Sequence, residues 1–252
     1  MVENRNNVKL DSVREEIREP LKAFAEKLTA TLRDNMQSIT VVGSSLTGDF
    51  VPKRSDINTV LVLGEQTLDS LKILAGMARS MSKRKLAAPL LMTQAYIERS
   101  RDVFGIEFLD FQLIHKTIFG SDPFISLVFA KKDVRVQCER ELKAALIRLR
   151  QGYIAAAASR RLVRDILISS VVGLVPLLRA MLWLKDIDRP SRAEGVFTKS
   201  ADEFSIEVHS LIAARKWRHE KKRLEADEIT AAFESIYTAV DKLAVIVDKL
   251  EV

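Results

Sequence analysis

The stretch ITVVGSSLTGDFVPKRSDINTVLVL, residues 39–63, decides how the first half of the chain folds. It opens with four β-branched residues, which predict a short strand that delivers Gly43 and Ser44 to a turn. After a polar loop the chain returns in a second apolar run that begins near Asp56. Residues two apart on a strand project from the same face, so Asp56 and Asn58 are expected to point together, beside the Gly43–Ser44 turn.

The segments around this stretch alternate between helical and extended patterns. Apolar residues at three- and four-residue intervals predict an amphipathic helix over 11–35, and a second helix is expected over 67–82. Besides the first strand, further strands are expected at 57–63, 88–93 and 104–112, the last reading FGIEFLDFQ. Strands that alternate with helices indicate an α/β layer with mixed pairing.

The second half of the chain has a different pattern. From residue 131 onward it is almost entirely helical, with the breaks near 186–195 and 215–223. Long amphipathic helices with short connections favour an antiparallel bundle. Gly and Pro in FGSDPF (119–124) mark the boundary, so we expect one domain over residues 1–124 and a second over 125–252. The helices are expected at 132–158, 160–185, 200–214 and 226–250.

The residues of the 39–63 stretch resemble a known family, the nucleotidyltransferases with the DNA polymerase β fold. The signature of that family is hG[GS], followed about ten residues later by D-h-[DE] on the next strand. GSSLTGDFVPKRSDIN looks most like the aminoglycoside adenylyltransferase branch, in which a helical domain follows the catalytic one. The resemblance implies an α+β fold: a nucleotidyltransferase domain with a mixed sheet, then an all-α helical bundle.

The resemblance also implies a site for a nucleoside triphosphate and Mg²⁺. Magnesium prefers hard oxygen ligands, and two such ions assist phosphoryl transfer in this family. The implied metal ligands are Asp56, Asn58 and Glu107, with Asp56 and Glu107 as the catalytic carboxylates. Asp110 competes with Glu107 for the third place, on the opposite face of the expected 104–112 strand. The implied nucleotide-binding residues are Gly43, Ser44, Lys53 and Arg54. The alternative interpretation of Lys53 and Arg54 is that they belong to a solvated loop.

Asn58 departs from the family pattern, which has an acid at this position. The amide keeps a carbonyl oxygen but loses the formal charge on which two divalent cations depend. Two functions therefore stay open. In one, the protein transfers a nucleoside monophosphate to a hydroxyl of a small molecule, with RNA a less favoured acceptor. In the other, it is a catalytically impaired nucleotide-binding regulator or an antitoxin-like partner of another protein.

The composition of the chain narrows the classes of protein to which it can belong. The chain has 252 residues, a net charge of +6 and 47% hydrophobic residues, as in ordinary globular proteins. Its single cysteine, Cys138, excludes an internal disulfide, and three histidines are too few for a His-based metal cluster. The longest uncharged run, 166–178, is shorter than the roughly 20 residues of a membrane span. We expect a cytoplasmic protein without a signal peptide or a membrane partner.

Two basic clusters and one histidine complete the list of candidates. The run RKWRHEKKR (215–223) is expected to be a solvated helix surface, with RNA or another phosphate-rich ligand as the alternative and Trp217 as a stacking group. The arginines near residue 160 fit either a binding cleft or a solvated face. His115 is expected to be structural. The helical half also offers surfaces for a homodimer.

Overall fold

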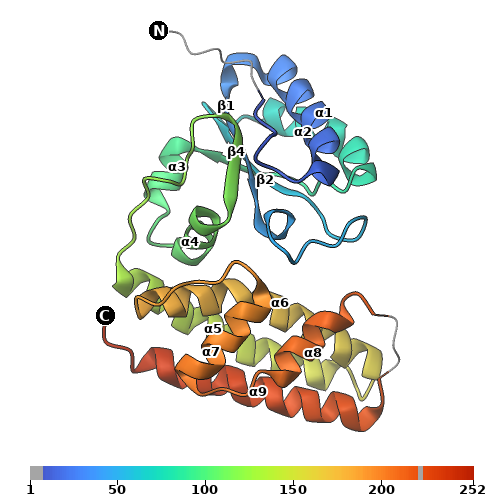
Figure 1. Cartoon of the computed structure of the whole chain (residues 1–252), viewed down its shortest axis with the longest axis vertical. Helices are drawn as coiled ribbons and strands as arrows, with labels where there is room; N and C mark the ends of the chain where they lie inside the picture. The colour runs from blue at the N-terminus through green and yellow to red at the C-terminus, as the bar shows by residue number, and fades with distance from the viewer. Residues whose placement is uncertain (1–7, 221–223) are drawn as a thin grey trace. The chain divides into compact units, whose positions relative to one another are not determined.

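The structure is a computed structural model that describes residues 8–220 and 224–252. The chain separates into two compact units (Figure 1). The first contains residues 1–101 and 108–128 and is built around a sheet. The second contains residues 102–107 and 129–252 and is helical. A short segment before Phe108 therefore groups with helices that follow it by more than twenty residues.

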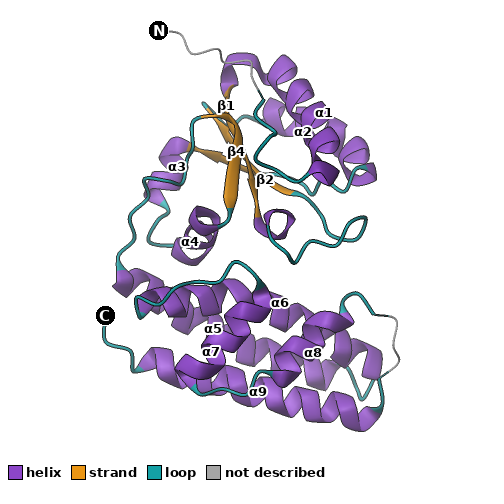
Figure 2. Cartoon of the chain, in the orientation of Figure 1, coloured by secondary structure: helices purple, strands orange, loops and turns teal. Residues whose placement is uncertain are grey.

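The first unit contains a mixed four-stranded sheet in the order β3-β2-β1-β4. Its strands are orange in Figure 2. β1 pairs with β2 and with β4 in antiparallel fashion, whereas β2 and β3 are parallel. Mixed pairing was expected from the sequence, and the four strands form one continuous layer. The strands are β1 (Met36–Val42), β2 (Asn58–Leu63), β3 (Leu90–Thr93) and β4 (His115–Gly120).

One face of the sheet is covered by α1 (Glu15–Leu32) and α2 (Leu68–Lys83), which lie side by side in Figure 2. α1 buries residues at three- and four-residue spacing, and Thr67 caps α2 by accepting a hydrogen bond from the Ser70 amide. Burial of such stripes is the main stabilising contribution, at about 25 cal/mol per Å² of apolar surface. The strand residues that pack into this core include Ile39, Val41, Leu61 and Leu63, and Ile57, just before β2, packs with them.

The strand expected at 104–112 is wrong. These residues form the helix α4 (Gly105–Leu113), and the fourth strand is β4, immediately after it. The alternation of aromatic and aliphatic residues in FGIEFLDFQ favours a strand locally, yet Ile106 and Leu109 are each buried, three residues apart as on one face of a helix. The remaining short elements are η1 (Arg33–Asn35), η2 (Gly43–Leu46) and α3 (Gln94–Arg99).

The helical unit is organised around its most apolar helix. α6 (Arg160–Leu184) packs against α7 (Ala193–Phe204), α8 (His209–Trp217) and both long helices, α5 (Lys131–Ala155) and α9 (Ala226–Asp248). The single helix expected at 200–214 is wrong, because Ser205 adopts a left-handed conformation (φ 51°) that ends α7.

α6 is long and apolar enough to cross a membrane by length and composition alone. In the structure, 56% of its most apolar window is buried inside the protein. A core helix of a soluble protein passes the same test, so this property is weak evidence for a span. The burial agrees with the expectation of a buried helix over 166–178.

Candidate nucleotide site

The Gly43 turn forms where β1 ends. Gly43 has a φ of +77°, a conformation that residues with a side chain rarely adopt, and it starts the 3₁₀ turn η2. Its amide donates a hydrogen bond to the carbonyl oxygen of Ile114, at 3.3 Å, next to the first residue of β4. The turn is thus held by β1, which leads into it, and by the residue that precedes β4.

Asn58 is the first residue of β2, and it pairs with Val42 across the antiparallel ladder. A Cβ added to Gly43 would stand 3.6 Å from the side-chain amide nitrogen of Asn58. Asp56 and Asn58 are both exposed, and between them Ile57 is buried in the core on the α1–α2 side. The two polar residues therefore project away from that core, on the side where the Gly43 turn lies.

The loop before β2 is a compact turn. The Val51 amide donates to the hydroxyl of Ser55 at 2.9 Å, and the Ser55 amide returns a bond to the Val51 carbonyl oxygen, also at 2.9 Å. Lys53 has a φ of 65°, and both Lys53 and Arg54 are exposed. Their proposed contact with phosphate stays a prediction.

Arg14 is a residue that the sequence did not single out. Its guanidinium donates hydrogen bonds to the carbonyl oxygens of Ser45 (2.7 Å) and Thr47 (2.5 Å), and it lies 4.8 Å from the centre of the Phe50 ring. One cation therefore holds the segment that follows Gly43. Arg14 precedes α1 in a region that reads as a helix start, so no sequence signal marked this contact.

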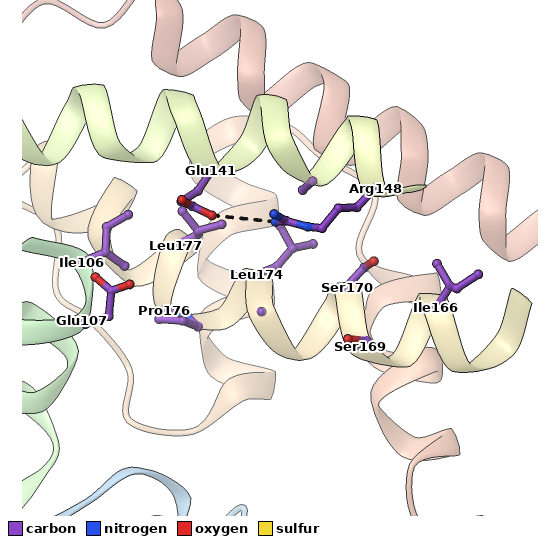
Figure 3. A pocket seen from close by; sticks show the side chains of 12 residues that line it. Ile106, Glu107, Glu141, Arg148, Ile166, Ser169, Ser170, Leu174, Pro176 and Leu177 are labelled. Atoms are coloured by element: carbon purple, nitrogen blue, oxygen red, sulfur yellow. Dashed lines mark ion pairs between the residues drawn. The ribbon is translucent and has the colours of Figure 1, made fainter. Parts of the chain in front are cut away.

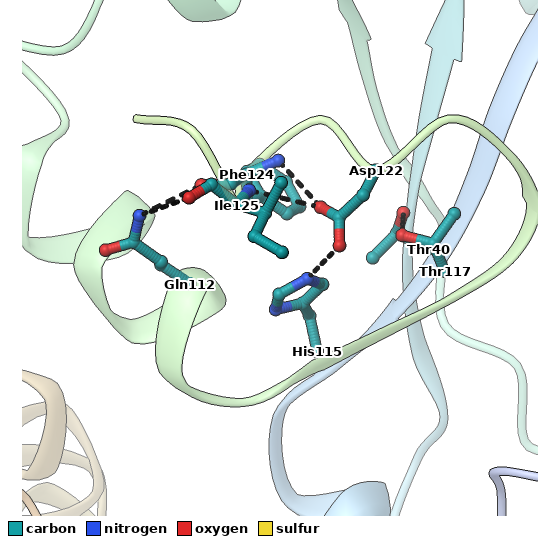
Figure 4. Close-up of polar contacts among 7 residues, drawn as sticks. All are labelled: Thr40, Gln112, His115, Thr117, Asp122, Phe124 and Ile125. Atoms are coloured by element: carbon teal, nitrogen blue, oxygen red, sulfur yellow. Dashed lines mark hydrogen bonds and ion pairs between the residues drawn. The ribbon is translucent and has the colours of Figure 1, made fainter. Parts of the chain in front are cut away.

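His115 and Asp122 form a pair at the start of β4 (Figure 4). His115 Nε2 lies 2.7 Å from Asp122 Oδ2, while Asp122 Oδ1 accepts bonds from the amides of Phe124 (2.9 Å) and Ile125 (3.2 Å). Burial raises the pKa of Asp122, but the bonds from His115 and from the two amides outweigh it and leave the pKa below its usual value. The pair ties the segment after β4 to the strand, which agrees with a structural role for His115.

Glu107 does not lie on a strand. It belongs to α4, groups with the helical unit, and accepts a hydrogen bond from the Gln137 side chain at 2.8 Å. Asp110 lies one helical turn further along α4, so the two carboxylates are not on opposite faces of a strand as expected. Glu107 and Asp110 were considered for the third acid because a strand was expected at 104–112. Without that strand, the assignment of either residue stays a prediction.

The basic clusters form contacts within the helical unit. Arg164 donates to the carbonyl oxygens of Trp217 and Glu220, and Arg160 lies 3.2 Å from Glu225. Trp217 is 8% exposed, so the structure does not support the alternative in which this residue stacks on a base of RNA. Residues 221–223 of the basic run lie outside the described residues.

No protein-family model matches the chain, and no curated protein sequence matches it. Among solved structures, the chain is similar to spectinomycin adenyltransferase AAD(9) from Enterococcus faecialis, which was crystallised with ATP and spectinomycin. The TM-score is 0.57 at 14% identity, and the match covers 88% of this chain and 98% of that one. This chain has the nucleotidyltransferase fold.

The Mg²⁺ that the sequence resemblance implies does not fit the residues of this nucleotidyltransferase fold. No group of three or more His, Cys, Asp or Glu residues suited to a metal ion is found in the described part of the chain. β3, the parallel neighbour of β2, reads LLMT and brings no acid. Of the two positions that the resemblance marks at the start of β2, Asp56 is a carboxylate and Asn58 is a neutral amide, whereas a two-metal centre requires several carboxylates.

Proposed function

We propose that this protein binds a nucleoside triphosphate at the Gly43–Ser44 turn without supporting two-metal nucleotidyl transfer. The supporting observation is the 3.6 Å approach of the Asn58 amide nitrogen to the Cβ position of Gly43. It brings the backbone turn and the segment that carries Asp56 together, as a phosphate-binding loop requires.

The turn suits an anion. A residue with positive φ followed by a helical turn is the backbone arrangement of anion-binding concavities, in which successive amides point to one side. Gly43 supplies the positive φ, and η2 supplies the helical turn. The Asn58 amide can donate a hydrogen bond to a phosphate oxygen, which a carboxylate at this position could do only if protonated.

Loss of charge at the site favours binding over catalysis. A carboxylate repels a triphosphate unless a cation lies between them, whereas the neutral side chain of Asn58 tolerates the triphosphate directly. In this proposal Asp56 orients water or a sugar hydroxyl, and the Gly43 turn holds phosphate. The protein would then act as a cytoplasmic nucleotide sensor or as the regulatory partner of another protein.

A second candidate function is transfer of a nucleoside monophosphate to a hydroxyl of a small molecule. The observation in its favour is the similarity to AAD(9) over 88% of this chain, which includes the helical region. This function requires Mg²⁺ to bind with the aid of ATP phosphates and Asp56 alone. It predicts release of pyrophosphate in the presence of an acceptor.

Thermal melting with and without nucleotide separates the two functions. Under our proposal ATP raises the melting temperature equally in EDTA and in Mg²⁺, and no pyrophosphate is released. Stabilisation only in Mg²⁺, together with pyrophosphate release when an aminoglycoside is added as the acceptor, supports the transferase. No response to any nucleoside triphosphate contradicts both.

A further inference from the structure

A pocket of about 470 Å³ lies between α5 and α6, entirely within the helical unit (Figure 3). Its volume is in the range of small-molecule sites, which are mostly apolar with a few polar groups that orient the ligand. Apolar side chains such as Leu174 and Leu177 line it, and Ser169 and Ser170 add hydroxyls. Charged groups enter from Glu107, Glu141 and Arg148.

The wall that α6 contributes contains residues that a helix does not favour. Gly173 and Pro176 both line the pocket from the interior of this helix, where each is less favourable than alanine. A Cβ added to Gly173 would meet nothing within 4 Å, so close packing does not require glycine here. Its effect is to leave the pocket wide.

One end of the pocket carries a negative charge. Glu107 accepts a hydrogen bond from the neutral amide of Gln137, and the described residues offer it no ion pair. Burial raises the pKa of the neighbouring Cys138 thiol to about 12, and the negative charge of Glu107 adds to the shift. The carboxylate of Glu107 is therefore available to a cation.

The other end carries a positive charge. Glu141 lies 3.0 Å from Arg140 and 3.8 Å from Arg148, so one carboxylate is shared between two guanidinium groups. The Arg148 side chain is 61% exposed, and Figure 3 shows its guanidinium above the pocket, on the far side of Glu141 from Glu107. Arg148 follows Gln137 by eleven residues, or about 16 Å along α5. The two charged ends are thus well separated.

We propose that this pocket binds a small zwitterionic molecule, with its ammonium group at Glu107 and its carboxylate at Arg148. The spacer between the two groups lies on the apolar floor, and any hydroxyl on it meets Ser169 or Ser170. An ammonium–carboxylate contact and an Arg–carboxylate contact are both charge-assisted hydrogen bonds, the stronger class in proteins. The site is independent of nucleotide binding at the Gly43 turn.

The test uses the full chain and a series of ω-amino acids from six to twelve carbons long. Ligand-observed NMR and calorimetry measure binding, with the α,ω-diamine and the α,ω-dicarboxylate of each length as matched controls. Glu107→Gln keeps the shape at one end and Arg148→Gln removes the charge at the other, with Glu234→Gln as a control on α9. Gly173→Leu fills the pocket in a position with free space.

The expected result is that one length of amino acid binds better than its diamine and its dicarboxylate. Either charge variant should weaken it about tenfold or more, as expected for a hydrogen bond to a charged group. Gly173→Leu should abolish binding without lowering the melting temperature, and Glu234→Gln should change nothing. The proposal is overturned if no probe binds, if the variants leave binding unchanged, or if the diamine or the dicarboxylate binds as well as the amino acid. No nucleotide is present, so this failure is distinct from a failure of the proposed function.

Discussion

The side-chain amide nitrogen of Asn58 lies 3.6 Å from the point where a Cβ on Gly43 would stand. This proximity follows from the antiparallel register, in which Asn58 pairs with Val42, the residue before Gly43. The end of β1 and the beginning of β2 therefore form one surface from two segments that are separated in sequence by the loop after Gly43.

Gly43→Ala tests the backbone half of this surface. The new methyl group would make only ordinary contact with Asn58, so the cost comes from the positive φ, about 1–2 kcal/mol of unfolding free energy. Nucleotide binding should fall because the turn shifts. Gly76→Ala, in the interior of α2 with nothing within 4 Å of the added Cβ, is the matched control. It should stabilise the protein by up to about 1 kcal/mol. Urea unfolding of both variants measures the contrast, and equal effects would contradict a strained turn at Gly43.

Asp56→Ala tests whether the remaining carboxylate is structural. Asp56 is exposed, so its removal should change the unfolding free energy by no more than about 0.5 kcal/mol. The melting temperature of the metal-free protein is the measurement. A drop of many degrees would show that Asp56 stabilises the fold and would remove it from the proposed site.

Asn58→Asp tests the metal interpretation. By itself the variant should bind Mn²⁺ only weakly, because two carboxylates do not make a two-metal centre. Leu90 is 47% exposed and pairs with Val60 in the parallel β2–β3 register, on the same face as Asn58. The double variant Asn58→Asp/Leu90→Glu should therefore bind Mn²⁺ roughly tenfold more tightly than the single one, through added charge. Asn58→Asp/Leu90→Gln is the uncharged control. Calorimetric titration decides, and tight Mn²⁺ binding by the unaltered protein would contradict the account.

Asp122→Asn tests the pair at β4. The pKa of Asp122 is lowered in the folded protein, so its contribution to stability is present above the unfolded value, near 3.8, and is lost as the pH falls below it. The variant should be about 1 kcal/mol less stable than the unaltered protein at pH 7, from the lost charge-assisted bonds. The difference should shrink as the pH approaches 3. Unfolding curves at several pH values measure this difference in stability. A difference that grows in acid would contradict a lowered pKa of Asp122.

The strand–turn–strand of the site could be predicted from the sequence because its signals are local. β-branched runs and Gly43 mark the first two strands and the turn, and the structure places β1 and β2 within two or three residues of the expectation. The α+β fold with a helical second part also agrees with the structure. These features can be predicted because the residue spacing that indicates each of them lies within one short segment of the sequence.

The segment around Glu107 could not be predicted in this way. Its alternating aromatic residues favour a strand, but contacts with a distant helix decide the outcome: the Ile106 amide donates to the Gln137 side chain at 3.1 Å. The same applies to Arg14, whose partners in the 45–47 segment are about thirty residues away. Tertiary contacts of this kind have no local pattern, so the strand expected at 104–112 was wrong, whereas the strands on either side of the Gly43 turn were predicted correctly.

Calorimetric titration of the full chain with ATP in EDTA tests the central claim most directly. The account predicts saturable binding whose affinity changes less than about threefold when Mg²⁺ replaces EDTA, and which is weakened in Gly43→Ala. Undetectable binding in EDTA, with tight binding restored by Mg²⁺, would contradict it.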